Sequence, residues 1–147
     1  MSLDEKIVED LKKAMKEKDA LRLSCLRMLK TALKNLQVDK QRKLRDEEIQ
    51  GVISSLIKKG KESATEFRSA GREELALKEE TEVAIFYGYM PRQLTPEDME
   101  NTLREIISEL SAENLSDLGK VMKVAMPRMA GKAQGKEVNE IAKRLLA

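Results

Sequence analysis

The sequence contains no histidine and no tryptophan, and its one cysteine is Cys25. Without histidine the chain cannot build the usual base of a Ser-His-Asp triad, and one cysteine supplies neither a zinc finger nor an internal disulfide. We therefore predict that the chain is not an enzyme on its own and that it holds no metal and no cofactor. Because Cys25 falls on the apolar face of a predicted helix, we expect a buried hydrophobic side chain rather than a reactive thiol.

Aromatic residues and long apolar runs are also scarce. The 147 residues include two Phe and two Tyr, and no apolar run approaches the roughly 18 residues that indicate a transmembrane helix. No basic segment followed by an apolar one lies near the beginning, as it would in a secretory signal. From these absences we predict a soluble, cytoplasmic protein with no membrane partner.

Charged residues make up 37% of the chain and are unevenly distributed along it. Residues 1–45 carry 13 basic and 7 acidic side chains, residues 46–114 carry 8 and 16, and residues 115–147 carry 7 and 3. Basic ends around an acidic middle are suited to contact with a polyanion at two separate surfaces. The same charges are equally typical of a solvated surface without a ligand.

Apolar residues recur with the period of α-helices along the whole chain. We predict an all-α fold with an N-terminal four-helix domain (1–90), a proline linker (91–95) and a C-terminal three-helix domain (96–147). Two prolines, Pro91 and Pro96, bar helix continuation through the linker. Helices are predicted over residues 3–18, 20–37, 47–70, 72–90 and 96–110, with a basic loop at 38–45. A sixth helix is predicted between Ser116 and Gly131, and a seventh over residues 138–146.

Capping residues support several of these limits. Ser2 with Glu5 forms a capping-box pattern, and Thr95 precedes a proline at the first helical position. Asp19, Asp46 and Ser116 are the N-caps predicted for the second, third and sixth helices.

Three further residues carry predictions about helix shape and packing. Pro127 is expected to bend the sixth helix and Gly131 to end it. Gly60 lies on the inward face of the third helix, where close approach of another helix explains it.

Residues 117–138, DLGKVMKVAMPRMAGKAQGKEV, depart from the regular helical pattern. They hold three of the seven glycines, with lysines and an arginine between them: Gly119, Lys120, Lys123, Arg128, Gly131, Lys132, Gly135 and Lys136. We expect the first glycine to allow close approach of another backbone, and the other two to permit a tight turn that exposes the first amides of the last helix.

Three interpretations of this stretch remain open. Because helix N-termini attract phosphate, one is a surface that binds backbone phosphates. Alternatively, the glycines only cap and turn a small bundle, or a protein docks on this surface. Stacking of bases needs aromatic side chains, which are too few here, so we expect no sequence readout and no DNA specificity.

Glu79 and Glu82 fall on the same face of the fourth predicted helix as several apolar residues. Carboxylates are rarely buried unless they are paired. Arg22 lies within the apolar arc of the second helix, so we predict a buried or half-buried ion pair between Arg22 and Glu79 or Glu82. A catalytic acid/base role is not favoured, because no nucleophile or metal ligand accompanies the two carboxylates.

Three segments resemble successive signatures of the YqeY family, in the right order along nearly the whole chain. They are GREELALKEETEVAIFYGYMPRQL (71–94), LSDLGKVMK (115–123) and GKAQGKEV (131–138). The last signature is usually Gly-Arg-Ala-Asp-Gly in that family, whereas Lys132 replaces the Arg and Gln134 the Asp here. Gln is a poorer N-cap than Asp, so the start of the last helix is expected to lack a good cap.

The YqeY family is similar to the tail of the B subunit of the glutamine-dependent tRNA amidotransferase, a carbon–nitrogen ligase. The resemblance implies a four-helix domain followed by a three-helix domain, with tRNA or another structured RNA as a partner. It also implies an amidotransferase, or another translation-related protein, as a partner, which leaves a helical protein-interaction adaptor as the alternative function. Because the resemblance is to the tail alone, it implies no catalytic residues.

Overall fold

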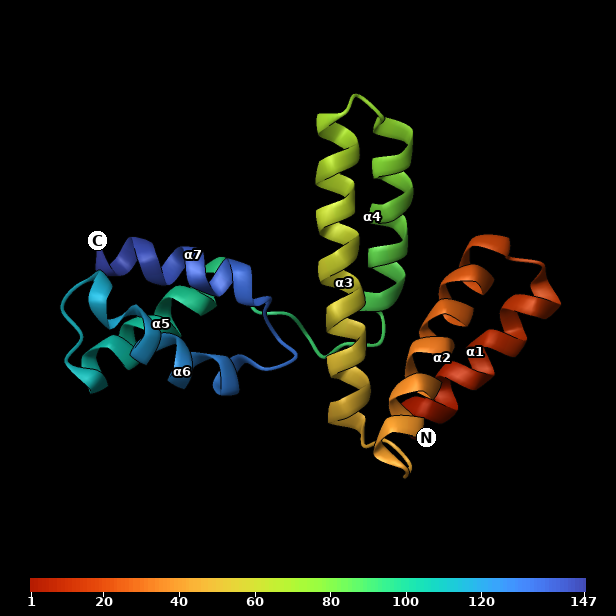
Figure 1. Ribbon diagram of the computed structural model, residues 1–147, viewed down its shortest axis with the longest axis horizontal. Coiled ribbons are helices and arrows are strands. Elements are labelled where there is room, and N and C mark those ends of the chain that lie inside the picture. Colours follow the sequence, from red (N-terminus) through yellow and green to blue (C-terminus); the bar gives the residue numbers. More distant parts are fainter. The chain divides into compact units, whose positions relative to one another are not determined.

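The chain is described over residues 1–147 in a computed structural model, and it is entirely helical (Figure 1). Seven α-helices and one short 3₁₀ turn contain all of its regular structure. Their bounds are α1 Leu3–Glu17, α2 Ala20–Lys40, α3 Asp46–Ser69, α4 Glu73–Tyr87, α5 Pro96–Leu110, η1 Leu115–Asp117, α6 Leu118–Met129 and α7 Gly135–Leu146. The predicted all-α class is confirmed. No helix is apolar enough over a sufficient length to cross a membrane.

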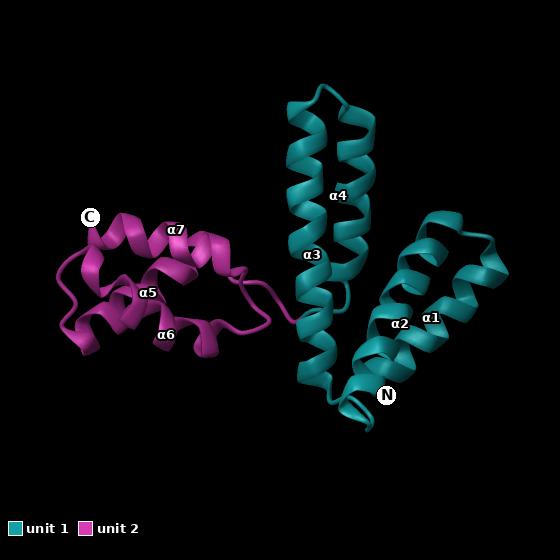
Figure 2. Ribbon diagram, viewed as in Figure 1, with its two compact units in different colours: residues 1–90 teal, residues 91–147 magenta.

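The chain divides into two compact units, unit 1 (Met1–Met90) and unit 2 (Pro91–Ala147), coloured separately in Figure 2. Unit 1 consists of two helical hairpins, α1–α2 and α3–α4, and unit 2 contains α5, α6 and α7. Each unit has its own cluster of buried apolar side chains. That each unit folds by itself as a domain stays a prediction.

The core of unit 1 joins the two hairpins. Its largest fully buried side chains come from all four helices: Ile7, Leu26, Leu29, Ile49, Ile53, Ile57 and Phe86. Cys25 lies among them with 1% of its surface exposed, which confirms the prediction of a buried hydrophobic side chain. Burial of this apolar surface is the main source of stability for such short helices.

Helix starts agree with the sequence where a capping pattern is present. The Ser2 hydroxyl accepts the N–H of Glu5 (3.2 Å), and the Glu5 carboxylate accepts the N–H of Ser2 (3.4 Å). Thr95 and Asp98 form the same reciprocal pair at the start of α5, with both distances 3.1 Å. The N-cap predicted at Asp19 is also formed, because its carboxylate accepts the N–H of Arg22.

The predicted basic loop at 38–45 is partly wrong. α2 continues to Lys40 and ends where Gln41 adopts a left-handed conformation. Asp46 is the first residue of α3 rather than its cap. Arg42 donates to both carboxylate oxygens of Glu48 (2.7 and 3.0 Å), which ties the short loop to the first turn of α3.

α6 continues through Pro127 to Met129, and Gly131 adopts a left-handed conformation two residues later, which agrees with the predicted end of the helix at Gly131. Ser116, in contrast, is not the cap of this helix. It lies within η1, and the residue preceding α6 is Asp117.

Gly60 is confirmed as a point of close helix approach. It is buried in α3, and a Cβ atom at this position would lie 2.5 Å from Cγ2 of Val83 in α4. α3 and α4 therefore pack so closely at position 60 that any residue larger than glycine would force Val83 or the helices to move.

Residues 91–95, predicted as a linker, belong to unit 2 and form hydrogen bonds within it. The N–H of Leu94 donates to the carbonyl of Lys132 (2.8 Å). The side-chain amide of Gln93 donates to the carbonyls of Pro91 and Gly131, both at 2.8 Å. We call residues 93–94 the strap, because they bind the turn between α6 and α7.

Limited trypsin digestion of the intact protein is expected to cleave first after Arg42 or Lys43, which are exposed and lie outside the helices. Cleavage after Arg92 is expected to follow more slowly, because the strap holds the next two residues. Mass spectrometry of the first fragments measures this order. An initial cut within residues 49–67 would contradict the helix assignment, since cleavage there requires α3 to open.

Candidate nucleic-acid interface

The turn between α6 and α7 is held from both sides. Gly131 has a φ of +77°, a left-handed conformation that favours glycine. The N–H groups of Lys132 and Ala133 donate to the carbonyl of Met129 (2.9 and 3.1 Å), which closes the end of α6. The strap occupies the carbonyls of Gly131 and Lys132. The backbone that carries the Lys132 side chain is therefore fixed, whereas the side chain itself is exposed.

The first turn of α7 begins at Gly135, and the preceding Gln134 provides no side-chain cap. This confirms the poor cap expected from a glutamine at position 134. Gly135 is helical rather than left-handed, so the tight turn needs Gly131 but not Gly135. The nearest neighbour of a Cβ atom at position 135 would be Cε of Met126 at 3.5 Å, so Gly135 lies against α6.

Lys136 is exposed in this first turn, next to the acidic residue Glu137. A carboxylate at a helix N-terminus competes with a phosphate for the same positive end of the helix dipole. The amides of α7 are therefore a weaker phosphate site than the sequence suggested, and the lysine side chains are the stronger part of this surface.

Lys120 and Lys123 are exposed on α6, three residues apart and on one face of the helix. Gly119 precedes them in open space, because a Cβ atom there would have no neighbour within 4 Å. No contact within the chain requires a glycine at position 119. Asp117 lies beside Lys120, and bonds from backbone N–H groups hold the pKa of its carboxyl below the usual range.

Arg128 is engaged within unit 2. Its Nη2 donates to Oε2 of Glu109 in α5 at 2.8 Å, and this pair raises the pKa of the guanidinium further. A contact between Arg128 and phosphate would have to replace this ion pair. We therefore remove Arg128 from the surface that the sequence predicted and retain Lys120, Lys123, Lys132 and Lys136, which we call the α6–α7 lysines.

The predicted ion pair of Arg22 with Glu79 or Glu82 is absent. Nε of Arg22 lies 3.6 Å from Oδ2 of Asp19, and the Arg22 side chain is 44% exposed. Glu79 and Glu82 are half-buried on α4. Arg22 lies near the start of α2, so the carboxylate of its own N-cap is the closer partner.

These charges nevertheless meet around the Cys25 thiol. Burial raises the pKa of Cys25 to about 11, with a further contribution from the carboxylate of Glu82, while Arg22 acts in the opposite direction. Burial together with the neighbouring Glu79 also raises the pKa of Glu82. This group therefore disfavours the thiolate, as expected for an unreactive cysteine.

Tyr89 forms a link that sequence reasoning missed. Its hydroxyl donates to Oδ2 of Asp10 in α1 at 2.6 Å, and Tyr89 is 7% exposed. Burial and this hydrogen bond raise the pKa of the Tyr89 hydroxyl. Gln93 of the strap was missed as well. Neither residue belongs to a periodic pattern that would identify a partner so far along the chain.

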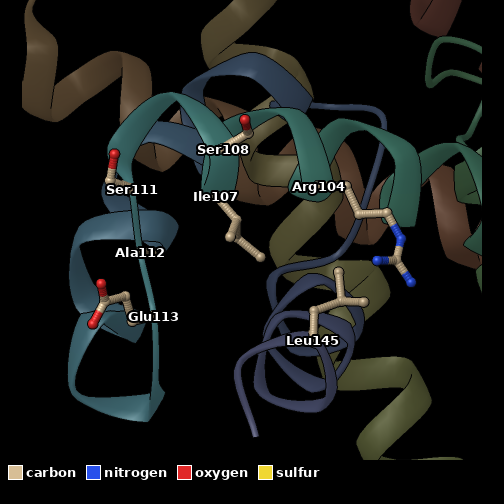
Figure 3. Close-up of a pocket in the computed structure, with 7 residues that line it drawn as sticks. All are labelled: Arg104, Ile107, Ser108, Ser111, Ala112, Glu113 and Leu145. Atoms are coloured by element: carbon tan, nitrogen blue, oxygen red, sulfur yellow. The ribbon is translucent and has the colours of Figure 1, made fainter.

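Unit 2 also contains an open hollow of about 350 Å³ between the C-terminal parts of α5 and α7 (Figure 3). Ile107 and Leu145 provide its apolar side chains, while Arg104 and Glu113 bring opposite charges to its edge. None of the α6–α7 lysines lines it. Ser108, Ser111 and Ala112 complete the lining.

Comparison with known families identifies the relatives of this chain. Residues 4–146 match the model of the YqeY family, described as Yqey-like protein. The chain belongs to the YqeY family. The resemblance of the three sequence segments is thereby confirmed over nearly the full length.

Curated relatives of this YqeY chain include fungal proteins with one common name, "Altered inheritance of mitochondria protein 41, mitochondrial". The protein from Lachancea thermotolerans is 33% identical over 111 residues, which are 74% of this chain and 59% of the relative. The protein from Vanderwaltozyma polyspora is 30% identical over 105 residues, which are 69% of this chain and 57% of the relative. The protein from Kluyveromyces lactis is 39% identical over 82 residues, which are 55% of this chain and 44% of the relative. The chain spans less than two thirds of these relatives.

These names contradict the cytoplasmic location predicted for the YqeY chain, because the relatives are designated mitochondrial. The prediction rested on the lack of a transmembrane run and of a secretory signal. Such absences concern membrane insertion and secretion, and they do not distinguish the cytoplasm from other aqueous compartments. The cytoplasmic assignment is therefore withdrawn.

Proposed function

We propose that this YqeY chain is a noncatalytic module that binds tRNA, or another structured RNA, through the phosphates of the RNA backbone. The observation that carries the proposal is the set of α6–α7 lysines. All four side chains are exposed, and none forms an ion pair within the chain. They lie on either side of a turn whose backbone is fixed by the strap. Because the backbone of this turn is already fixed, binding through Lys132 would order its side chain but not the turn.

The aromatic side chains support recognition of the backbone rather than of bases. Phe86 and Tyr89 are buried. Nζ of Lys61 lies 5.2 Å from the ring centre of Tyr87, and Nζ of Lys6 lies 5.5 Å from that of Tyr89. Neither tyrosine ring therefore provides a free platform for base stacking. Recognition through shape and phosphates suits a folded RNA, and sequence preference is expected to be weak.

The choice of tRNA over other RNAs rests on the similarity of the family to the tail of the tRNA amidotransferase B subunit. A protein-interaction adaptor is the second candidate. Two large apolar side chains of unit 2, Leu110 and Leu115, are 40% and 52% exposed and favour it. Binding through these leucines would depend on apolar burial and vary little with salt.

The proposal is tested by filter binding of total tRNA, duplex DNA and heparin at several salt concentrations. Each phosphate contact releases counterions, so the affinity for tRNA is expected to fall steeply with salt. Replacing Lys132 and Lys136 with Gln is expected to reduce the slope of log affinity against log salt by about 1.5 to 2 units. The helical circular dichroism should be unchanged, since both side chains are exposed.

The matched control is the double change Lys58→Gln and Lys59→Gln on α3. It removes the same charge from an exposed surface in the acidic middle of the chain, and it should leave the slope unchanged. Equal affinity for tRNA, heparin and duplex DNA would contradict an RNA function. Loss of partner binding on changing Leu110 and Leu115, with no dependence on salt, would favour the adaptor.

A further inference from the structure

The exposed face of α2 carries basic charge over most of its length. Between Ala20 and Val38 the helix contains no Asp or Glu. Arg27, Lys30 and Lys34 are exposed and are spaced three and four residues apart, so they lie on one face. We call them the α2 row. Its length from Arg27 to Lys34 is about 10 Å along the helix axis.

The α2 row has no partner within the chain. None of its side chains forms an ion pair or a hydrogen bond. Six of the nine other arginines of the chain pair with carboxylates: Arg22, Arg42, Arg68, Arg104, Arg128 and Arg144. The charge of the row is therefore available to an external ligand.

Folding does not benefit from this arrangement. Like charges three or four residues apart on a helix repel each other by roughly 0.2–0.5 kcal/mol per pair. The row also lies apart from the core, because the buried residues of α2, Cys25, Leu26, Leu29 and Leu33, occupy another face. A bound polyanion would relieve this repulsion, whereas no carboxylate of the chain does so.

Neutral side chains on the same exposed surface indicate which polyanion fits. Ser24, Thr31 and Asn35 lie exposed beside the row. Together with Arg and Lys, these residue types make most protein contacts to nucleic-acid phosphates and sugars. A lipid surface would need a continuous apolar helix face as well. The apolar face of α2 is mostly buried in the core of unit 1, which leaves only Met28 and Val38 exposed among its large apolar side chains.

From these observations we infer that the α2 row of unit 1 is a second backbone-contact surface for the RNA proposed to bind the α6–α7 lysines of unit 2. The inference rests on the proposed function in naming the ligand class. It gives the RNA one contact surface in each unit, which matches the two basic ends of the sequence. Two linked surfaces on one chain increase affinity beyond that of either alone only when both engage the same RNA.

The inference is tested on the full-length protein with total tRNA as the probe. The double change Lys30→Gln and Lys34→Gln is expected to reduce the salt slope by about 1.5 to 2 units, as each lost contact retains its counterions. The control Lys58→Gln with Lys59→Gln should not change it. In a second measurement, tRNA is expected to lower the rate at which a lysine-acetylating reagent modifies Lys30 and Lys34 several-fold, with no effect on Lys58.

The outcomes separate this inference from the proposed function. The α2 row alone would be overturned if the Lys30→Gln and Lys34→Gln variant kept the wild-type salt slope and tRNA did not slow acetylation of Lys30 and Lys34. In that case the Lys132→Gln and Lys136→Gln variant would still show a reduced salt slope. The reverse pattern would overturn the α6–α7 lysines and leave the α2 row in place. Both proposals would be overturned if the protein did not bind tRNA at low salt, or if the lysine changes reduced binding of heparin and duplex DNA as much as binding of tRNA. The α2 row would then be a solvated surface.

Discussion

Replacing Gly60 with Ala is expected to destabilise unit 1 by roughly 1–3 kcal/mol, the range found for overpacked cores. The new Cβ atom would lie 2.5 Å from Cγ2 of Val83, far inside van der Waals contact. Val83 cannot easily turn away, because a β-branched side chain in a helix has one strongly preferred rotamer. The clash should outweigh the roughly 1 kcal/mol by which Ala exceeds Gly as a helix former.

Gly51 is the matched control in the same helix. It is exposed, and a Cβ atom there would have no neighbour within 4 Å. Gly51→Ala is therefore expected to stabilise the protein by up to about 1 kcal/mol. Urea denaturation monitored by circular dichroism measures both changes, which should differ in sign.

A double change tests whether Val83 is the cause. Val83→Ala removes the atom that the new Cβ would meet, so Gly60→Ala should cost less in that background. Such contacting pairs show coupling energies of roughly 0.5–3 kcal/mol. If the free-energy effects of Gly60→Ala and Val83→Ala were strictly additive, the strain would lie elsewhere. A Gly60→Ala protein as stable as the Gly51→Ala protein would contradict close packing of α3 and α4.

Much of the fold could be predicted because its determinants are local. Ser2 with Glu5, and Thr95 with Asp98, need only residues three apart to form their capping boxes. The buried position of Gly60 follows from helical periodicity, which places it on the same face as Ile53 and Ile57. For these features the sequence and the structure agree.

The wrong predictions concern the ion-pair and hydrogen-bond partners of side chains. In some cases the partner lies on another helix, and in others a nearby residue is the closer partner. Arg22 pairs with the nearby Asp19 rather than across helices, and Arg128 pairs with Glu109 of α5. The strap brings Gln93 to Gly131, which lies 38 residues away in the sequence. Spacing along one helix does not specify such contacts, because they depend on how the helices pack. That the α6–α7 lysines form a binding site stays a prediction. The hydrogen bonds that support their turn, and the pairing of Arg128, could not be predicted from the sequence.

The α2 row illustrates the opposite limitation. The excess of basic residues in the first 45 residues was evident from the sequence, but the exposed state of the row was not. The structure confirms the buried face of α2 and shows that the side chains of the row are exposed and without an ion pair. Charge counts therefore indicated a surface, and the fold determined its residues.

Raising the pH is expected to destabilise unit 1 through Cys25. The thiol ionises at about its ordinary pKa of 9.0 in the unfolded chain, whereas burial holds the folded pKa at about 11. The stabilising effect of the neutral thiol is complete below pH 9 and is lost as the pH rises through 11. Between pH 8 and pH 10.5 the loss is roughly 2 kcal/mol, since one pKa unit corresponds to about 1.4 kcal/mol.

Cys25→Ala isolates this contribution from those of other groups, including Tyr89, whose raised pKa acts in the same direction. At pH 8 the variant is expected to be less stable than the wild type by roughly 1 kcal/mol, because removal of the sulfur leaves a small cavity. At pH 10.5 it should equal or exceed the wild-type stability, since it has no thiol to ionise. Urea denaturation at the two pH values measures this reversal. A constant difference between the two proteins would mean that the Cys25 thiol ionises equally well in the folded and unfolded states.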